Sequence, residues 1–489
     1  MVQSRWYMLI YPNYQKRRHA VSTITEPDHR ACFRSLTDEV RIDSLPVTGE
    51  IPAWLSGELI RNGPAQYEVG SRSLNHWFDG HAMLHRFGFA NGVISYANRF
   101  LDTRARRAAL DKGEVRLTEF ATDPCRSIFG RVQTAFSPQF TDNANVNLVR
   151  LGDKCLALTE TPMPVVFDPE TLATLGMEKS PGHHVTAHPH ADPRSGEMIS
   201  YAVHFGPRTT YRLHASRDGH TYRTIAKIGV REPGYMHSFA LTEHYAILAE
   251  HPLLVNPLRL ALGNQSFIEN YRWHADRPTR LIVIDRHTGT LRGTFEAEPC
   301  FAFHHVNAFE DGPELVVDAC VYDDDEIIRS TYLDRLRTED PRIPRGTLRR
   351  WRVHLQVGSV RSEHLADTPL ELPRVNYRRV NTRPYRYTWG TSISPQGRFL
   401  DRIAKVDVVD GTTTIWEQPA CFPGEPVFVA APDAREEDDG LVLTVTLDAK
   451  HGTSFLAVLD GRTLRELARA SVPHHIPAGL HGQFLGTRS

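Results

Sequence analysis

The chain has 489 residues, of which 40% are hydrophobic and 24% charged, and its formal net charge is −1. This composition is typical of a globular protein that can bury a sizeable core, and a nearly neutral chain has no overall field to attract nucleic acid, so we expect no nucleic-acid partner. The six cysteines are scattered without a CxxC pair. They argue against a disulfide framework or a zinc ribbon and favour a reducing compartment, so we expect a cytoplasmic protein.

The N-terminal residues 1–30 are polar and unpatterned, and we predict a flexible arm followed by one domain over 31–489. The apolar run from Trp6 to Tyr11 is too short for a signal peptide and is followed by no cleavage-site pattern. No stretch approaches the roughly 18 apolar residues that a membrane-spanning helix needs.

From Ile51 onward, short β-like runs alternate with turn signals. Asn91-Gly92 lies between two alternating runs, a strong hairpin signal because both turn residues must take positive φ. Further turns are expected at Gly152-Asp153, Asp410-Gly411 and Asp460-Gly461.

A second pattern consists of a strand, an aspartate, a polar turn with threonine, and another strand. It recurs from Val165, Leu281 and Leu456. Helical patterns are few, around Leu110 and from Thr331 to Leu336. Such repetition predicts an all-β fold, and a propeller of about seven blades fits the length at roughly 45–65 residues per blade.

Histidines are the candidate metal ligands, but there are 25 of them and most must be ordinary core, turn or surface residues. Four lie beside small, apolar or turn-forming residues, as expected of strand starts near a propeller axis: His188, His237, His304 and His481. Ligands from different blades can converge on one ion at the axis. Four neutral imidazoles would leave iron(II) its full charge and open positions for O₂ and substrate.

Carboxylates are expected behind such a ligand set, to orient the rings and offset charge. Glu160, Glu371 and Glu425 are candidates because each is embedded in otherwise apolar sequence. A lone buried glutamate is costly unless a positive or donating group meets it. The alternative is that these three pair with arginines.

The segment NHWFDGHAM and the residues after it hold His76, Asp79, His81 and His85. This grouping suggests a hydrolase site, but we favour a structural role for it in a blade.

At these residues the sequence resembles the carotenoid cleavage oxygenases, and most of all the branch of β-carotene oxygenases and the retinal pigment epithelium isomerohydrolase. Ten motifs in family order, from about residue 45 to the C-terminus, carry the resemblance: GELIRNGPAQYEVG, NHWFDGHAMLHRF, TEFATDPCRSIFGR, TDNANVNL, TAHPH, YMHSFALT, FHHVNAFE, YRYTWG, GEPVFVAAPDAREEDDG and IPAGLHGQF.

The resemblance implies a seven-bladed propeller with one Fe²⁺ on its axis under a cap of loops and short helices. It implies that His188, His237, His304 and His481 are the ligands, with His304 preferred over its neighbour His305. It further implies that Glu160, Glu371 and Glu425 support three of the rings, and that Thr159 sits beside the open coordination position.

The implied reaction is cleavage of a conjugated C=C bond by O₂ to give aldehyde or ketone products. The absence of lysine between Arg131 and Arg150 leans toward a carotenoid or apocarotenoid rather than a stilbene. Three alternatives stay open: a stilbene-cleaving dioxygenase, a retinoid isomerohydrolase on the same iron site, and a propeller that only binds a ligand.

Two apolar stretches bear on substrate entry. They are either core packing or a patch around the cavity mouth that lets a lipid-dissolved polyene enter, with peripheral membrane association. The candidate entry residues are Ile128, Phe129, Val132, Phe136, Leu253, Leu254 and Leu258. Basic residues beside them, Arg126, Arg131 and Arg259, would suit lipid headgroups.

Overall fold

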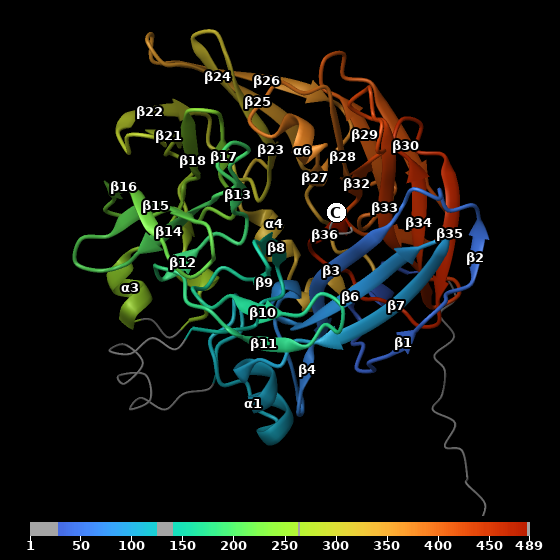
Figure 1. Cartoon of the computed structure of the whole chain (residues 1–489). Coiled ribbons are helices and arrows are strands. Elements are labelled where there is room, and N and C mark those ends of the chain that lie inside the picture. Colours follow the sequence, from blue (N-terminus) through green and yellow to red (C-terminus); the bar gives the residue numbers. More distant parts are fainter. Residues whose placement is uncertain (1–27, 125–139, 263–264, 487–489) are drawn as a thin grey trace, which may run out of the picture.

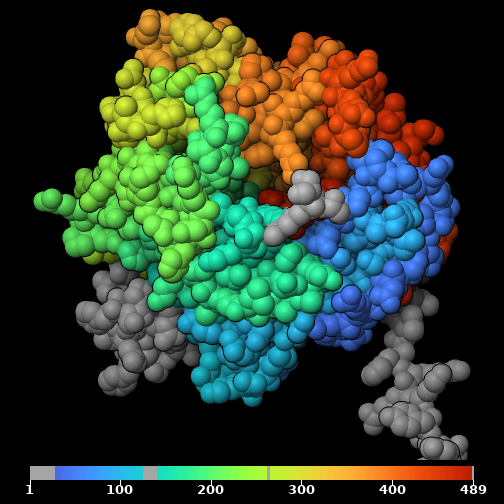
Figure 2. Space-filling model, in the orientation of Figure 1, coloured from blue at the N-terminus to red at the C-terminus, as the bar shows by residue number. Residues whose placement is uncertain are grey.

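The computed structural model describes residues 28–124, 140–262 and 265–486. Seven antiparallel sheets of four or more strands follow one another around a central axis (Figure 1). The predicted all-β, seven-bladed propeller is therefore confirmed. Figure 2 shows the same face in space-filling form, where the colours succeed one another around the axis in chain order.

Each blade runs from an inner strand at the axis to an outer strand at the rim. From the inside outward, blade 1 holds β36 (Gly482–Gly486), β3 (Gly57–Gln66), β6 (His81–Ala90), β7 (Val93–Phe100) and β1 (Arg41–Ile42). Blade 2 holds β8 (Asn147–Leu151), β9 (Lys154–Leu158), β10 (Val165–Phe167) and β11 (Thr174–Met177). Blade 3 holds β12 (His184–Val185) and β13 (His190–Ala191), both on β14 (Met198–His204), then β15 (Thr210–Ser216) and β16 (Arg223–Gly229). Blade 4 holds β17 (Ala240–Leu241), β18 (Tyr245–Glu250), β21 (Thr279–Asp285) and β22 (Leu291–Ala297).

The remaining blades follow the same plan. Blade 5 holds β23 (His305–Asp311), β24 (Glu314–Val321), β25 (Thr347–His354) and β26 (Ser359–Ala366). Blade 6 holds β27 (Glu371–Arg374), β28 (Tyr387–Ser392), β29 (Arg402–Asp407) and β30 (Thr413–Glu417). Blade 7 holds β31 (Cys421–Pro423) and β32 (Val427–Ala430), both on β33 (Gly440–Asp448), then β34 (Thr453–Asp460), β35 (Glu466–Val472) and β2 (Val47–Gly49). Two small hairpins lie outside the blades: β4 (Glu68–Val69) with β5 (Arg72–Ser73), and β19 (Leu253–Leu254) with β20 (Arg272–Trp273).

Both ends of the chain close the ring. The C-terminal strand β36 pairs with β3 at the axis, so the last strand completes the first blade. Near the N-terminus, β2 extends the outer edge of blade 7 through β35, while β1 extends blade 1 through β7. The two terminal parts of the chain thus join blades 1 and 7, and the ring is closed.

The predicted turns are present. Asn91 and Gly92 take φ of 51° and 76° between β6 and β7, as the hairpin prediction requires. In the turn after β34, Leu464 takes positive φ and Gly461 does not. Gly461 is needed for space instead, because a Cβ there would lie 2.7 Å from the carbonyl oxygen of Asp438.

The recurring aspartate ends a strand and caps the turn that follows. Its Oδ1 accepts the backbone N–H of the threonine three residues on, at 2.7 Å for Asp168, 2.9 Å for Asp285 and 2.8 Å for Asp460. The repeat seen in the sequence is thus a turn motif between adjacent strands of three blades.

Apolar side chains fill the spaces between neighbouring blades, and a cap of short helices and loops covers one end of the axis. One such interblade cluster packs Val283 and Phe295 of blade 4 against Val317 and Trp351 of blade 5. In the described part of the chain the helices are η1 (His29–Phe33), η2 (Trp77–Asp79), α1 (Arg104–Lys112), α3 (Pro257–Leu262), η3 (Ile268–Asn270), α4 (Glu326–Ser330), α5 (Leu333–Leu336) and α6 (Tyr377–Val380). Among the described residues, no helix is long and apolar enough to cross a bilayer.

The boundary of the predicted arm needs adjustment. His29 and Arg30 belong to η1, Asp28 caps that helix, and His29 is buried. Residues 1–27 lie outside the described part, so the arm itself stays a prediction.

Candidate metal centre

The four candidate histidines lie where inner strands begin. His188 stands between β12 and β13, and His237 lies just before β17. His304 and His481 immediately precede β23 and β36. The sequence predicted that these histidines lie at strand starts near the axis, and the fold places them there.

These histidines converge on one point. The Nε2 atoms of His188 and His237 are 2.9 Å apart, and those of His304 and His481 are 3.1 Å apart. One ring nitrogen from each of the four lies within 4.8 Å of all the others. Three of the four residues are buried and His188 is half-buried. The chain thus brings four imidazoles from four blades to a single position.

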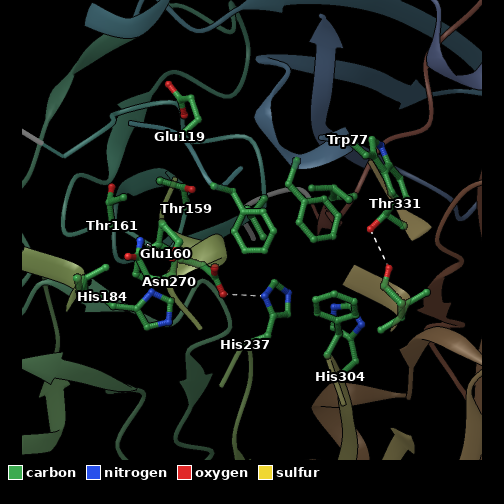
Figure 3. A pocket seen from close by; sticks show the side chains of 18 of the residues that line it. Trp77, Glu119, Thr159, Glu160, Thr161, His184, His237, Asn270, His304 and Thr331 are labelled. Carbon is green, nitrogen blue, oxygen red and sulfur yellow. Dashed lines mark hydrogen bonds and ion pairs between the residues drawn. The ribbon is translucent and has the colours of Figure 1, made fainter. Parts of the chain in front are cut away.

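Carboxylates hold the opposite side of three rings, as predicted. His237 Nδ1 donates to Glu160 Oε1 at 2.7 Å, and His481 Nδ1 donates to Glu425 Oε1 at 2.7 Å. His304 Nδ1 donates to Glu371 in the same way. Figure 3 shows the bond from His237 to Glu160. The structure gives His188 no carboxylate partner among the described residues.

The donor set fits a cation. A carboxylate only accepts hydrogen bonds, so each supported ring carries its hydrogen on Nδ1 and turns an Nε2 lone pair to the centre. Burial also lowers the pKa of His188 well below its ordinary value and that of His481 to about 4, which keeps both rings neutral near pH 7. Crowded lone pairs repel one another unless a metal ion accepts them. Imidazoles backed by carboxylates suit a divalent transition metal.

Further hydrogen bonds fix the three carboxylates. Tyr235 Oη donates to Glu160 at 2.9 Å, and Tyr322 Oη donates to Glu371 at 2.5 Å. Glu425 pairs with the buried Arg61 and lies 3.5 Å from Arg374. Although burial opposes its charge, Arg374, His481 and Arg61 outweigh burial and lower the pKa of Glu425, which stays ionised. The arginine pairing considered from the sequence is therefore real for Glu425 and coexists with its support of His481.

Every blade contributes one residue to this arrangement. Histidines come from blades 1, 3, 4 and 5, and glutamates from blades 2, 6 and 7. The sevenfold ring thus supplies four candidate ligands and three supporting carboxylates around one axis.

A large cavity opens onto this centre. Its volume is about 1570 Å³, and His237, His304 and His481 form part of its wall. Most of the remaining wall is apolar and aromatic, including Trp77, Phe78, Phe120, Phe205, Phe267, Phe303 and Phe399. A cavity of this size and lining suits a long apolar ligand.

The other predicted site residues have mixed outcomes. Thr159 lines the cavity one residue before Glu160, and its place beside an open coordination position stays a prediction.

Leu258 lines the cavity and is 72% exposed. Leu253 and Leu254 are buried in the cap at 2% and 8% exposure, so the prediction that they form an entry surface is wrong. They belong to β19, which pairs with β20. Ile128, Phe129, Val132 and Phe136 lie outside the described residues.

The histidines of the NHWFDGHAM region have structural roles. His76 Nδ1 accepts the N–H of Phe78 at 3.1 Å, and its Nε2 donates to the carbonyl of Ile328 at 3.0 Å. Asp79 accepts hydrogen bonds from Thr122 Oγ1 at 2.6 Å and from the N–H of Ala121 at 3.0 Å. These contacts join blade 1 to the cap and support the structural interpretation.

Sequence reasoning missed several residues around the centre. Tyr235 lies two residues before His237, in the same YMHSFAL motif, so its closeness in sequence was the only signal that could have found it. Tyr322 and Arg61 carry no such local signal, because each reaches its glutamate from a distant part of the chain. Val146 was also missed: it lines the cavity, and its carbonyl accepts the N–H of His481 at 3.2 Å.

Comparisons with known proteins agree with this architecture. The family model described as retinal pigment epithelial membrane protein matches residues 33–486. A carotenoid isomerooxygenase of Galleria mellonella is 34% identical over 498 residues, covering 94% of this chain and 96% of that protein. The β,β-carotene 15,15'-dioxygenase of Homo sapiens is 32% identical over 506 residues, covering 90% of this chain and 91% of that protein.

The crystal structure of cobalt-substituted ACO from Synechocystis has a TM-score of 0.84 and 29% identity, covering 94% of this chain and 99% of that one. A family match over nearly the whole chain, relatives above 30% identity and a shared fold lead to one conclusion. The chain belongs to the retinal pigment epithelial membrane protein family, the carotenoid oxygenases.

Proposed function

We propose that this protein is an iron(II) dioxygenase that cleaves a conjugated C=C bond of a carotenoid or apocarotenoid with O₂, giving two carbonyl products. The observation that carries the proposal is the convergence of four Nε2 atoms at the wall of an aromatic cavity. His188, His237, His304 and His481 would hold the ion. Bound iron(II) would supply the electrons that O₂ needs to react with a closed-shell alkene.

The chain's own residues orient the ligands and the substrate. Glu160, Glu371 and Glu425 hold the Nδ1–H of three rings, which presents their lone pairs without a change of tautomer. The aromatic wall excludes water and stacks against a flat polyene. The reaction needs no acid–base pair, because both atoms of O₂ enter the products and no proton is consumed.

We further propose that substrate enters from a lipid surface with which the protein associates peripherally. Leu258 is exposed at 72% and lines the cavity, and Arg259 follows it in α3. An exposed leucine at a cavity mouth beside a cation suits the interface of a bilayer. Sedimentation with liposomes tests this: L258E should reduce the bound fraction, and equal binding by both proteins would contradict the proposal.

The decisive experiment measures metal content and oxygen incorporation together. The protein, reconstituted with iron under anaerobic conditions, is analysed for bound metal and then given ¹⁸O₂ with β-carotene, an apocarotenal, resveratrol or a retinyl ester. We expect about one iron per chain and ¹⁸O in both aldehyde products from a carotenoid or apocarotenoid.

Other outcomes identify the alternatives. Label in products from resveratrol alone would favour stilbene cleavage, and unlabelled retinol from the ester would favour isomerohydrolysis. Absence of bound metal would leave only a ligand-binding propeller. Because one relative is named an isomerooxygenase, the products should also be resolved for double-bond geometry.

A further inference from the structure

The wall of the large cavity contains a buried acid that the proposed reaction does not use. Glu119 is 6% exposed and lines the cavity. Thr141 Oγ1 donates to Glu119 Oε1 at 2.8 Å, and Thr161 Oγ1 donates to the backbone carbonyl of Thr141 at 2.6 Å. Glu119, Thr141 and Thr161 all line the cavity. In Figure 3, Glu119 and Thr161 lie apart from His237 and His304.

Two further carboxyl groups lie near Glu119, and both are well supplied with donors. Asp79 accepts from Ala121 N, Thr122 Oγ1 and His76 N at 3.0, 2.6 and 3.1 Å. Asp142 accepts from Ala105 N at 3.0 Å and from Arg104 N and Nε at 2.7 and 3.1 Å. Glu119 has fewer donors. Thr141 donates to it, and a hydrogen bond from the amide of Asn143 offsets a part of the increase in pKa that burial causes.

Glu119 is therefore the carboxyl group of the three with the fewest hydrogen-bond donors around it. Burial, reinforced by the charge of Asp79, raises the pKa of Glu119 well above its ordinary value. A raised pKa favours the neutral form of the carboxyl group, and this form carries an O–H donor. Thr141 already donates to Oε1, so an O–H on Oε2 would be left for a group inside the cavity. Asn143 gives its amide hydrogens to the carbonyls of Asp79 and Gly80 at 3.1 and 3.0 Å.

We propose that Glu119 is a specificity-determining residue that recognises an oxygen-bearing end group, a hydroxyl or a carbonyl, on the polyene. This inference rests on the proposed function and narrows its substrate class to polyenes with an oxygenated end. A buried O–H with no partner is costly, so an end group with an oxygen atom satisfies it and a methyl-terminated hydrocarbon does not. Elsewhere the cavity wall is chiefly apolar and accepts the hydrocarbon part of either ligand.

The test compares ligands that differ only at the end group. Iron-loaded protein is titrated without O₂ with an apocarotenal, the matching alcohol and the methyl-terminated hydrocarbon of the same polyene length, and quenching of tryptophan fluorescence gives the dissociation constants. We expect the wild-type protein to bind the oxygenated ligands about tenfold more tightly than the hydrocarbon. E119L should remove this preference by weakening the oxygenated ligands alone.

The matched control is E232Q. Glu232 lines the same cavity, but Arg277 already occupies its carboxylate at 3.0 Å, so this variant should keep the wild-type preference. No preference in the wild-type protein, or equal weakening of all three ligands by E119L, would overturn the inference.

A second measurement avoids dependence on the folding of E119L. Infrared difference spectra of the anaerobic wild-type protein should show the stretch of a protonated carboxyl group shifting when the aldehyde binds, and the isosteric E119Q should lack this band. A wild-type spectrum without the shift would contradict the inference. Because no O₂ is present, binding selectivity is measured separately from cleavage. Selective binding without turnover in air would reject the proposed reaction alone. Turnover in air without selective binding would reject the role of Glu119 alone.

Discussion

Two groups of buried histidines in this propeller can be compared, one around the axis and one in the segment that runs from His76 to His85. Around the axis, three Nδ1 atoms are held by carboxylates and the Nε2 atoms face one another. In the second place, His76 bonds to the backbone and His85 Nδ1 lies 2.9 Å from Tyr96 Oη. Burial alone therefore does not mark a ligand. The axial group differs in that ring nitrogens of four histidines converge and a carboxylate holds the Nδ1 of three of them.

The largest effect is expected when a candidate ligand from the axial group is replaced, because the metal should then be lost. H481A should abolish iron retention, because it removes one of four Nε2 donors and leaves Glu425 without its ring. H305A should retain about one iron per chain, because His305 Nδ1 faces Ser238 Oγ at 2.8 Å rather than the centre. Elemental analysis of both purified variants is the measurement, and the reverse result would move the ligand assignment to His305.

Replacing a supporting carboxylate should have the next largest effect. We expect E425Q and E371Q each to weaken iron binding by about 10–100-fold. E425Q should also lower the free energy of unfolding by about 3–5 kcal/mol, because Arg61, itself buried, would lose its counter-charge. E371Q leaves no buried cation unpaired and should cost about 1 kcal/mol. Iron titration and denaturant unfolding of both variants separate the two effects, and equal destabilisation would show that the Arg61 pair contributes little.

The sequence was sufficient for the architecture and for the seven residues at the axis. Turn signals such as Asn91-Gly92 and the repeated Asp–Thr turn are local, so they indicate a hairpin repeat without knowledge of the tertiary fold. The axial residues carried weak local signals, and the family motifs raised them to a definite set. Arg61 and Tyr322 could not be found in this way, because long-range packing brings them to Glu425 and Glu371. For Leu253 and Leu254 the sequence left core packing and an entry surface open, because an apolar run looks the same whether it faces lipid or the cap.

The structural histidines give a smaller effect, on stability rather than on metal. H76L should lower the free energy of unfolding by about 2–4 kcal/mol, because the N–H of Phe78 and the carbonyl of Ile328 would lose a buried partner. H81L is the matched control: His81 is 4% exposed, and neither of its ring nitrogens has a hydrogen-bond partner within the described residues. It should be neutral or stabilising. Iron content per folded chain should stay unchanged in both, and loss of iron from H76L would contradict the division between the two groups.

The smallest effect concerns pH. Burial lowers the pKa of His85 to about 3, against an ordinary value of about 6.5. Below pH 6.5 the unfolded chain therefore takes up a proton at this position that the folded chain does not, and the stability that is fully present above pH 6.5 falls as the pH is lowered toward 3. The loss from one such histidine is about 1.4 kcal/mol per pH unit. H85Q should remove the pH-dependent loss of stability that comes from His85. The unfolding free energy of H85Q, measured relative to that of the wild-type protein, should therefore rise as the pH is lowered from 6.5 to 5. Parallel curves over that range would mean that His85 gains its proton without unfolding.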